Sequence, residues 1–378
     1  MKKRVVLILI ASLLLLCACQ ADAPKPGQAL QKERAFEFVT VSFDCVLPVQ
    51  QKRYPTYRVQ KSMLTAEDYA KILAACSEGA EWLNVLNKPF SPETQPKGSF
   101  KVTRALKDGT GDAVFHGNMN GNRYAMYTGG TYDVTLSETG FESWPEDEPL
   151  LQTIKELPSI TKEEAEKTAN AFKDEAGCYD HYGISRTERA LHVDIQTNEV
   201  HSDGWLVIYT PQFGGATFGY EVGSVGWIGE PPVSYAPWEP TESLTVYVAE
   251  AGIRTVEQKG YSAYSRDKEA APLSAEKMVD AIENWFGDRF CFEDISENKV
   301  VGFIVRKINL RYAVIEGKDA ETGIAVPCWE VCFYYQFDYH GEKSESTVQR
   351  IVFNAIDGSY IEPYRVRDAD SSGSQELG

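Results

Sequence analysis

Three segments of the chain alternate apolar and polar residues with the period of an amphipathic helix. They begin near Thr65, Thr161 and Ser274, and apolar residues recur behind each start at intervals of three or four. The apolar positions are Tyr69, Ile72, Leu73, Cys76, Ala80 and Leu83, then Ala165, Ala169, Phe172 and Ala176, then Met278, Ala281, Ile282, Trp285 and Phe286. Thr65 and Thr161 each precede an acidic residue by three positions, which is typical of a capping box. The pattern therefore predicts three helices with one apolar face each.

Runs rich in β-branched and aromatic residues lie between and after these helices. Ile308, Leu310, Tyr312 and Val314 alternate with polar or small residues, which predicts a strand in a sheet with one buried face. The other predicted strands cover residues 36–43, 57–59, 100–106, 113–127, 191–195, 205–210, 300–315, 326–338 and 349–361. Asn-Gly at 120–121 and Asp-Gly at 357–358 predict hairpin turns.

The order of these elements predicts an α+β fold built from repeated units, each with one amphipathic helix packed on an antiparallel sheet. Residues 36–240 are expected to form an N-terminal α+β region with room for two such units. Residues 241–364 are expected to form a separate C-terminal α+β domain. Residues 20–35 are polar, contain two prolines and show no periodicity, which predicts a flexible tether. Residues 365–378 are expected to be a disordered acidic tail.

The first 19 residues predict where the protein resides. Three basic residues at 2–4 precede an apolar run, the pattern of a signal peptide, and the run is shorter than the roughly 20 residues that span a bilayer. The run ends in Leu-Cys-Ala-Cys at 16–19, which resembles the lipobox of bacterial lipoproteins. This resemblance implies that Cys19 is acylated and holds the protein on the extracytoplasmic face of the cell membrane. The alternative is an ordinary secretory signal with incidental cysteines.

The composition and net charge of the chain indicate which classes of binding partner to expect. Of the 378 residues, 43% are hydrophobic, which is ample for packed cores. The formal net charge is −17. An acidic surface repels phosphate backbones and anionic headgroups, so we expect no nucleic-acid partner and no electrostatic adhesion to the bilayer. Contact with the bilayer is then expected through the acylated Cys19 alone.

The cysteines behind the signal segment do not form a recognisable framework. Six remain, and outside the cytoplasm they permit up to three disulfides: Cys45, Cys76, Cys178, Cys291, Cys328 and Cys332. Cys76 falls on a helical apolar stripe, which favours buried free thiols. Cys328 and Cys332 lie in one predicted strand at about 13 Å, too far to bond each other or to share a metal ion with His340. We expect no metal site and no cofactor.

The sequence contains no recognisable catalytic pattern. The chain has no G-x-S-x-G, H-E-x-x-H, Walker A or G-x-G-x-x-G pattern, and its S-x-x-K matches lack the S-D-N and K-T-G partners of penicillin-recognising enzymes. His192 and His201 lie on neighbouring segments and could meet, although surface positions are the simpler interpretation. The sequence therefore predicts a protein that is not an enzyme.

An aromatic stretch rich in glycine and proline is the one candidate binding segment. Its candidate ligand contacts are Phe218, Tyr220, Trp227, Tyr235 and Trp238. Exposed aromatic side chains in a groove supply much of the energy for binding a peptide or glycan. The alternative is that the same residues pack a connection between domains.

Several short motifs carry a family resemblance. Trp-x-Val at 205–207 and at 329–331, behind helices opened by Ser/Thr-x-Glu, resembles PepSY-like and YycH/YycI-like extracytoplasmic modules. Residues 241–364 are also similar to the C-terminal part of uncharacterised lipoproteins from Gram-positive bacteria, through PWEP at 237–240, VPCW at 326–329 and NAIDGS at 354–359.

This resemblance implies a non-enzymatic binding or regulatory role for an anchored protein, with an envelope peptide, a glycan or a membrane protein as partner. The alternative is a surface hydrolase acting on cell-envelope polymer. A pocket with two carboxylates about 5 to 9.5 Å apart beside aromatic platforms would favour the hydrolase.

Overall fold

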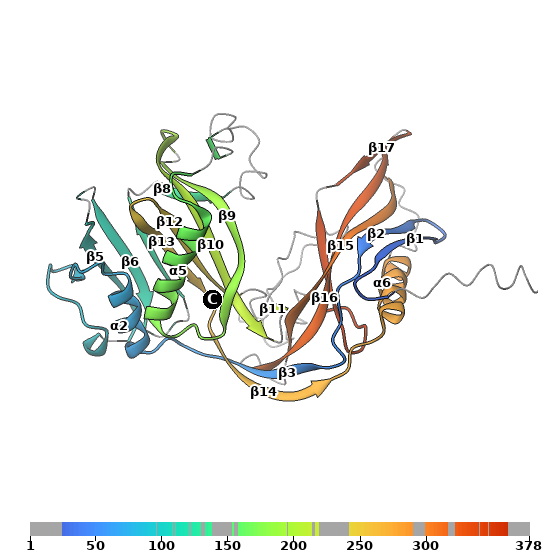
Figure 1. Ribbon diagram of the computed structural model, residues 1–378, viewed down its shortest axis with the longest axis horizontal. Helices are drawn as coiled ribbons and strands as arrows, with labels where there is room; N and C mark the ends of the chain where they lie inside the picture. The colour runs from blue at the N-terminus through green and yellow to red at the C-terminus, as the bar shows by residue number, and fades with distance from the viewer. Residues whose placement is uncertain are drawn as a thin grey trace, which may run out of the picture.

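Two lobes, each a curved sheet with helices on one face, make up the protein (Figure 1). The computed structural model describes residues 25–361 except for 96, 108, 110, 120, 122, 130–132, 138–152, 155–157, 195, 214–215, 219–241, 290–298, 317–321, 340 and 347. Within this part of the chain, strands far outnumber helices, and all described strands join one hydrogen-bonded network of 18 strands. The lobes are two halves of that network.

The first lobe is an antiparallel sheet of nine described strands. In spatial order they are β8 (Asp133–Ser137), β9 (Tyr182–Asp194), β10 (Glu199–Phe213), β12 (Ser243–Ala249), β13 (Gly252–Lys259), β7 (Tyr124–Thr128), β6 (Asp112–Asn118), β5 (Ser99–Ala105) and β4 (Leu83–Asn84). The long β9–β10 hairpin lies at the side of this sheet that faces the second lobe (Figure 1).

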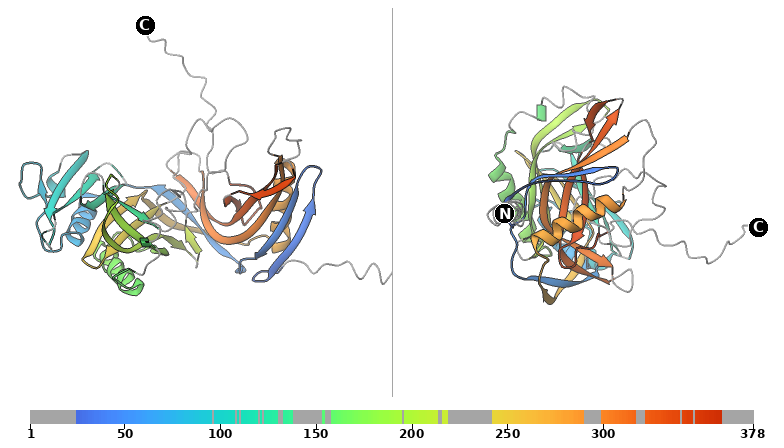
Figure 2. Two further views of the ribbon diagram at one scale, coloured as in Figure 1. Left: turned by 90° about the horizontal axis from the view of Figure 1, so that it is seen from above. Right: turned by 90° about the vertical axis from the view of Figure 1, so that its right-hand side faces the viewer.

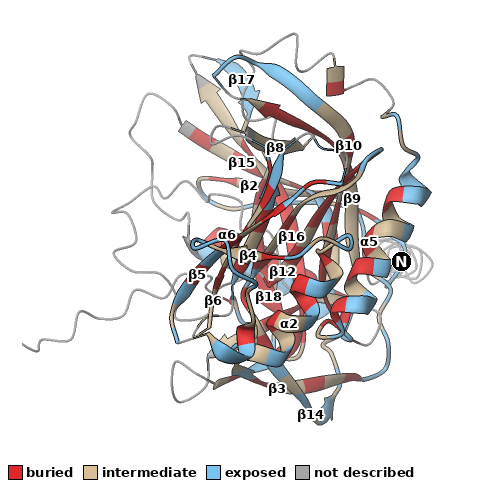
Figure 3. Cartoon of the chain, turned by 90° about the vertical axis from the view of Figure 1, so that its left-hand side faces the viewer, coloured by how far each residue is buried: buried red, intermediate tan, exposed pale blue. Residues whose placement is uncertain are grey.

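Two helices cover one face of the first sheet. They are α2 (Ala66–Ala75) and α5 (Lys162–Ala176), and a short 3-10 helix, η1 (Pro92–Thr94), lies beside α2. The capping boxes predicted at Thr65 and Thr161 are present, and the predicted stripe of α5 and that of α2 from Tyr69 to Cys76 are buried in one core. Ala80 and Leu83, predicted to continue the first stripe, lie beyond the end of α2, and Leu83 belongs to β4. Figure 3 shows the buried side of each helix turned toward the sheet and the exposed side turned to solvent.

The second lobe combines the start of the chain with its last third. Its strands are β1 (Ala29–Ala35), β2 (Thr40–Val46), β3 (Tyr54–Lys61), β11 (Ala216–Phe218), β14 (Ser262–Ala270), β15 (Lys299–Glu316), β16 (Thr322–Tyr339), β17 (Glu342–Glu345) and β18 (Gln349–Asn354). The β15–β16 hairpin is its spine, with β2 along β15 and with β3, β18 and β17 in turn along β16. Helix α6 (Ala275–Arg289) packs on one face, where Phe286 stacks on Phe303 at 4.5 Å.

Among the described residues, three connections join the lobes. Strand β3 leads from the second lobe to α2, and β13 passes through Gly260 into β14, as the lower edge of Figure 1 shows. The end of β10 pairs with β11, which lies parallel to β15. Viewed from above, the lobes lie end to end with these strands between them (Figure 2).

The predicted fold class is wrong. The protein is mainly β and is not a series of units with one helix on one sheet, because α2 and α5 share a single sheet and a single core. The physical reason is that apolar periodicity identifies helices and strands but does not say which strands pair. Here the pairing is non-local: β7 pairs with β13, and β2 pairs with β15.

Sheet membership also differs from the expected domain limits. Strands β1 to β3 belong with the C-terminal strands, whereas β12 and β13 complete the first sheet, so pairing crosses the expected limit at 240/241 in both directions. Part of the expected tether, residues 29–35, is strand β1, which pairs with β2. The predicted signal peptide, Cys19 and the acidic tail lie outside the described residues.

Candidate functional site

A cleft of about 750 Å³ lies between the two lobes. One wall comes from β9, β10, β12 and β13 of the first sheet, and the other from β15, β16 and β18 of the second. In a strand, alternate side chains point to opposite faces, so the face away from the helices carries every second residue. The lining residues alternate with the core residues along these strands, so the cleft is the place where the two helix-free sheet faces meet.

Cations dominate the described lining of this cleft. Six basic side chains line it against two carboxylates, Glu257 and Glu330. The basic residues are Arg186, Lys259, Arg306, Lys307, Arg311 and Arg350. The whole chain has a net charge of −17, so this lining is opposite in sign to the average of the protein. A cleft lined by one sign of charge focuses the electric field and concentrates ions of the other sign.

The arginine of the first wall is fixed by a carboxylate on its own strand. Arg186 and Glu188 are two residues apart on β9, so both side chains lie on the cleft face. Arg186 Nε lies 2.5 Å from Glu188 Oε1, and the Glu188 side chain is only 9% exposed. This ion pair fixes the direction of the guanidinium, which retains 39% exposure.

The second wall repeats the arrangement across a strand pair. Glu330 on β16 is 3% exposed and accepts a hydrogen bond of 2.7 Å from Asn309 Nδ2. Arg311 Nε lies 3.5 Å from the same carboxylate oxygen, and the other end of this guanidinium contacts Thr217 of β11. A buried carboxylate thus orients Arg311 toward the cleft.

At the rim, Arg306 has looser partners. Its guanidinium lies 3.2 Å from Glu345 and 3.6 Å from Asp44, and it sits 5.8 Å from the ring centroid of Tyr334. The arginine and both acids are substantially exposed, and exposed ion pairs of this kind stabilise a protein by at most about 1 kcal/mol. The charge of Arg306 therefore contributes more to the field of the cleft than to folding.

A second hollow, of about 490 Å³, lies at one end of the first sheet and contains His192 and His201. The two rings do meet, with centroids 6.1 Å apart, but His192 is buried and its Nε2 donates to the carbonyl of Thr128 at 2.8 Å. Among the described residues no group of three or more His, Cys, Asp or Glu side chains is placed to hold a metal ion.

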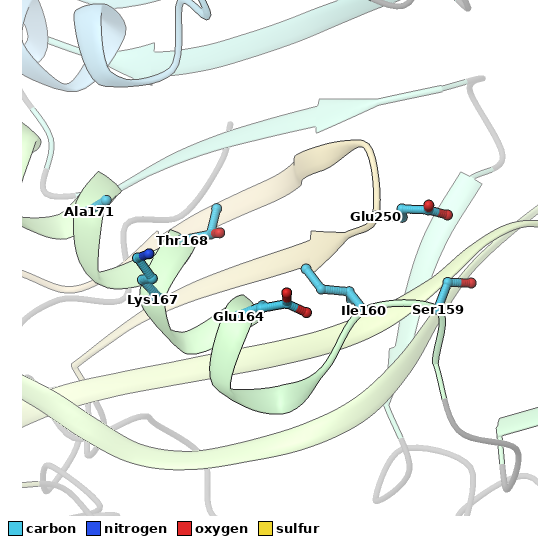
Figure 4. Close-up of a pocket in the computed structure, with 7 residues that line it drawn as sticks. All are labelled: Ser159, Ile160, Glu164, Lys167, Thr168, Ala171 and Glu250. Carbon is cyan, nitrogen blue, oxygen red and sulfur yellow. The ribbon is translucent and has the colours of Figure 1, made fainter.

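A third hollow lies beside the first turn of α5 and is open to solvent. Figure 4 shows Glu164 and Lys167 on α5 with Glu250 across from them, on the turn between β12 and β13. Glu164 belongs to the capping box, and its hydrogen bonds to Thr161 lower the pKa of its carboxyl. A general acid for glycoside cleavage needs a raised pKa, and no aromatic platform occurs among the described lining residues. This hollow does not fit the hydrolase alternative.

Most of the aromatic residues predicted as ligand contacts lie outside the described part of the chain. Phe218 ends β11, where its backbone pairs with Tyr312 in a parallel bridge. The other four, Tyr220, Trp227, Tyr235 and Trp238, lie outside the described residues. Their role as ligand contacts remains a prediction.

The described cysteines are unpaired thiols, and all except Cys178 are buried; free buried thiols were the favoured prediction, with disulfides as the alternative. They are Cys45, Cys76, Cys178, Cys328 and Cys332, and Cys291 lies outside the described residues. Cys328 and Cys332 both lie on β16, and Cys332 lines the cleft. Burial raises the pKa of the Cys332 thiol, so it is not poised as a nucleophile.

Comparisons with known proteins identify a shared fold but no shared function. No protein-family model and no curated protein matches the sequence. The chain is similar to the crystal structure of an uncharacterized protein from Eubacterium rectale ATCC 33656, with 13% identity and a TM-score of 0.50. The match covers 89% of this chain and 94% of that one, so it spans both lobes. At this identity the likeness concerns the fold alone.

The cationic cleft was not among the sites predicted from the sequence. One signal was present: the predicted alternation at 308–314 leaves Lys307, Asn309 and Arg311 together on the opposite, polar face. Nothing in the sequence says that this polar face meets the polar face of a second sheet.

Proposed function

We propose that this protein is a lipid-anchored extracytoplasmic binding protein whose ligand is an anion held in the cleft between the lobes. The observation that carries the proposal is the set of six basic side chains that line the cleft of a protein with net charge −17. The lipobox-like segment and the resemblance to extracytoplasmic lipoproteins support the anchored location. The absence of a catalytic pattern in the sequence supports a binding role.

The dimensions and polarity of the cleft support the same role. A volume of about 750 Å³ is within the range of about 300 to 1,000 Å³ typical of ligand pockets. Leu206 and Ile208 of β10 line it beside the basic residues, so a ligand with both acidic and apolar parts would be matched. The hydrolase alternative needs a general acid with a raised pKa. Glu242 is the one described carboxyl group whose pKa is raised, and it does not line the cleft, so we assign no catalytic residues to this alternative.

Anion binding by the cleft is tested with pyrophosphate and citrate as probes, measured by isothermal titration calorimetry. Replacing Lys307 and Arg350 together with glutamine should weaken binding by at least about tenfold, or 1.4 kcal/mol. The affinity of the native protein should also fall as salt rises, because salt screens the attraction.

A matched control removes the same number of charges elsewhere. Lys88 and Lys277 are exposed on the first lobe and on α6 respectively, and neither lines the cleft. Replacing both with glutamine should leave binding unchanged. Equal affinity in the two double variants, or no binding of either probe by the native protein, would refute the cleft as an anion site.

A further inference from the structure

Three arginines from the two lobes act on one another across the cleft. Arg186 belongs to β9 of the first lobe, whereas Arg311 and Arg350 belong to β15 and β18 of the second. Burial lowers the pKa of the Arg186 guanidinium; Glu188 opposes this shift, and the charges of Arg350 and Arg311 add to it. Positive charges repel each other, so Arg186 on the first lobe is repelled by Arg311 and Arg350 on the second.

Two of these guanidinium groups are set in place before any ligand arrives. Glu188 holds Arg186 at 2.5 Å, and Glu330 holds Arg311 at 3.5 Å. Both carboxylates are nearly buried, at 9% and 3% exposure. A site whose donors are already oriented loses less side-chain entropy on binding, which favours affinity.

The described connections between the lobes lie on one side of the cleft. The lobes are tied along one side by the β10–β11 pairing and by a two-stranded ribbon, in which β3 and β14 are hydrogen-bonded to each other from Tyr54 to Lys61. At the turn between β13 and β14, Gly260 has φ +66°, a conformation natural to glycine. The arginines that repel each other lie on the cleft side, and the connecting strands lie on the other side. Repulsion between the arginines therefore favours a wider angle between the lobes.

We propose that Arg186, Arg311 and Arg350 form one anion site shared by the two lobes, and that an anion bound there draws the lobes together. The inference rests on the proposed binding function and deepens it, because it names the charge chemistry of the ligand and the motion that binding drives. A single anion replaces repulsion between the lobes with two attractions, one to each wall.

The ligand must present at least two acidic oxygens on opposite sides to contact both walls. Phosphate esters, diphosphates and small polycarboxylates meet this requirement, and the planar fork of a guanidinium matches both carboxylate and phosphate in a bidentate geometry. A monocarboxylate would reach one wall only. We therefore expect pyrophosphate and citrate to close the cleft and acetate to leave it unchanged.

The motion is measured between the lobes by pulsed electron paramagnetic resonance. Spin labels are attached at Lys88→Cys in the first lobe and Lys277→Cys on α6, in a Cys178→Ser background, because Cys178 is the one described native thiol that is not buried. Saturating pyrophosphate should move the distance distribution to shorter values. Acetate at the same ionic strength should not.

Arg186→Glu gives the sharpest test. The change also removes the cation that pairs with Glu188. Two carboxylates of the first wall would then face Arg311 and Arg350, so the labelled variant should have the short distance without ligand and should bind pyrophosphate at least about tenfold more weakly. Arg186→Gln should also bind more weakly but keep the long distance with and without the probe. Arg189→Glu makes the same charge change on the opposite face of β9 and should behave as the native protein does.

The outcomes separate this inference from the proposed function. Pyrophosphate binding with an unchanged distance distribution in the native protein would overturn the shared site and leave the anion-binding function standing. An Arg186→Glu variant that stays open, with a normal circular dichroism spectrum, would also overturn the inference. No anion binding in the native protein would overturn both.

Discussion

Glu242 illustrates how a single buried charge can tie stability to pH. The side chain is 2% exposed and lies just before β12, where the two lobes join. Tyr182 at the start of β9 donates a hydrogen bond to its Oε2 at 3.3 Å, and Ser262 and Tyr264 of β14 bond it from the other lobe. Burial raises the pKa of the carboxyl, and these hydrogen bonds only partly oppose the shift.

A raised pKa in the folded state means that the folded protein holds this proton more tightly than the unfolded chain does. The stabilisation is therefore complete below the unfolded pKa, near 4.5, and is lost as pH rises through the folded pKa. Glu242→Gln keeps the shape without the charge, so the variant should lose this decline, which is at most about 1.4 kcal/mol per pH unit. Urea unfolding of both proteins between pH 4.5 and 7 tests this, and parallel profiles would contradict it.

Single residues differ in how far the sequence reveals their role. The caps at Thr65 and Thr161 were readable, because a capping box is a local pattern over four residues. The role of Arg186 could not be predicted from the sequence. Its partner Glu188 is two residues away, but Arg311 and Arg350 are brought near it only by the tertiary fold. Local chemistry can be predicted from sequence, whereas a site assembled across a cleft cannot.

At the scale of elements, helix α5 depends on its first turn. Thr161 Oγ1 accepts from the Glu164 N–H at 3.3 Å, and Glu164 Oε2 accepts from the Thr161 N–H at 3.2 Å, so two backbone donors without helical partners are satisfied. The apolar face behind this cap, from Ala165 to Ala176, is buried in the core that α5 shares with α2.

Thr161→Ala should therefore destabilise the protein by about 1 kcal/mol, because it removes the cap side chain. Thr168→Ala is the matched control: it makes the same substitution within α5, where alanine has the higher helix propensity, and should cost nothing. Chemical denaturation of the two variants gives the comparison. Equal losses of stability would show that the cap contributes nothing specific.

Strands were predicted well where their alternation was long and poorly where it was not. The alternation at 308–314 lies within β15, as predicted, and its continuation covers Lys299–Glu316. Strand β9 was predicted only at 191–195, although it begins at Tyr182, because its first half carries charged residues, of which Arg186 lines the cleft. Strands are recognised in a sequence by alternating apolar residues, and a strand that lines a polar site carries fewer of them.

At the scale of the whole molecule, the lobes are assembled from segments distant in sequence. Strand β2 pairs with β15 across more than 250 residues, and β12 and β13 return to the first sheet after the chain has left it. No periodicity encodes such pairing, which explains why the repeated α+β units were the wrong prediction. The solved Eubacterium rectale structure, matched over 89% of this chain, has the same fold at 13% identity.

The predicted location of the protein depends on residues 1–19, which lie outside the described part of the chain. Within the described residues no helix is long and apolar enough to cross a membrane. An acidic protein is repelled by anionic headgroups, so attachment would depend on the acyl chains at Cys19. The anchorage hypothesis therefore rests on one residue.

Cys19→Ser should remove the acceptor and leave an unprocessed precursor or release the protein from the membrane. Cys17→Ser is the control, because Cys17 lies in the segment that processing removes, and this variant should fractionate as the native protein does. Membrane and soluble fractions are compared by immunoblotting, with metabolic labelling by a clickable fatty acid to detect the lipid. Native protein found wholly in the culture medium, or label retained in Cys19→Ser, would reject acylation at Cys19.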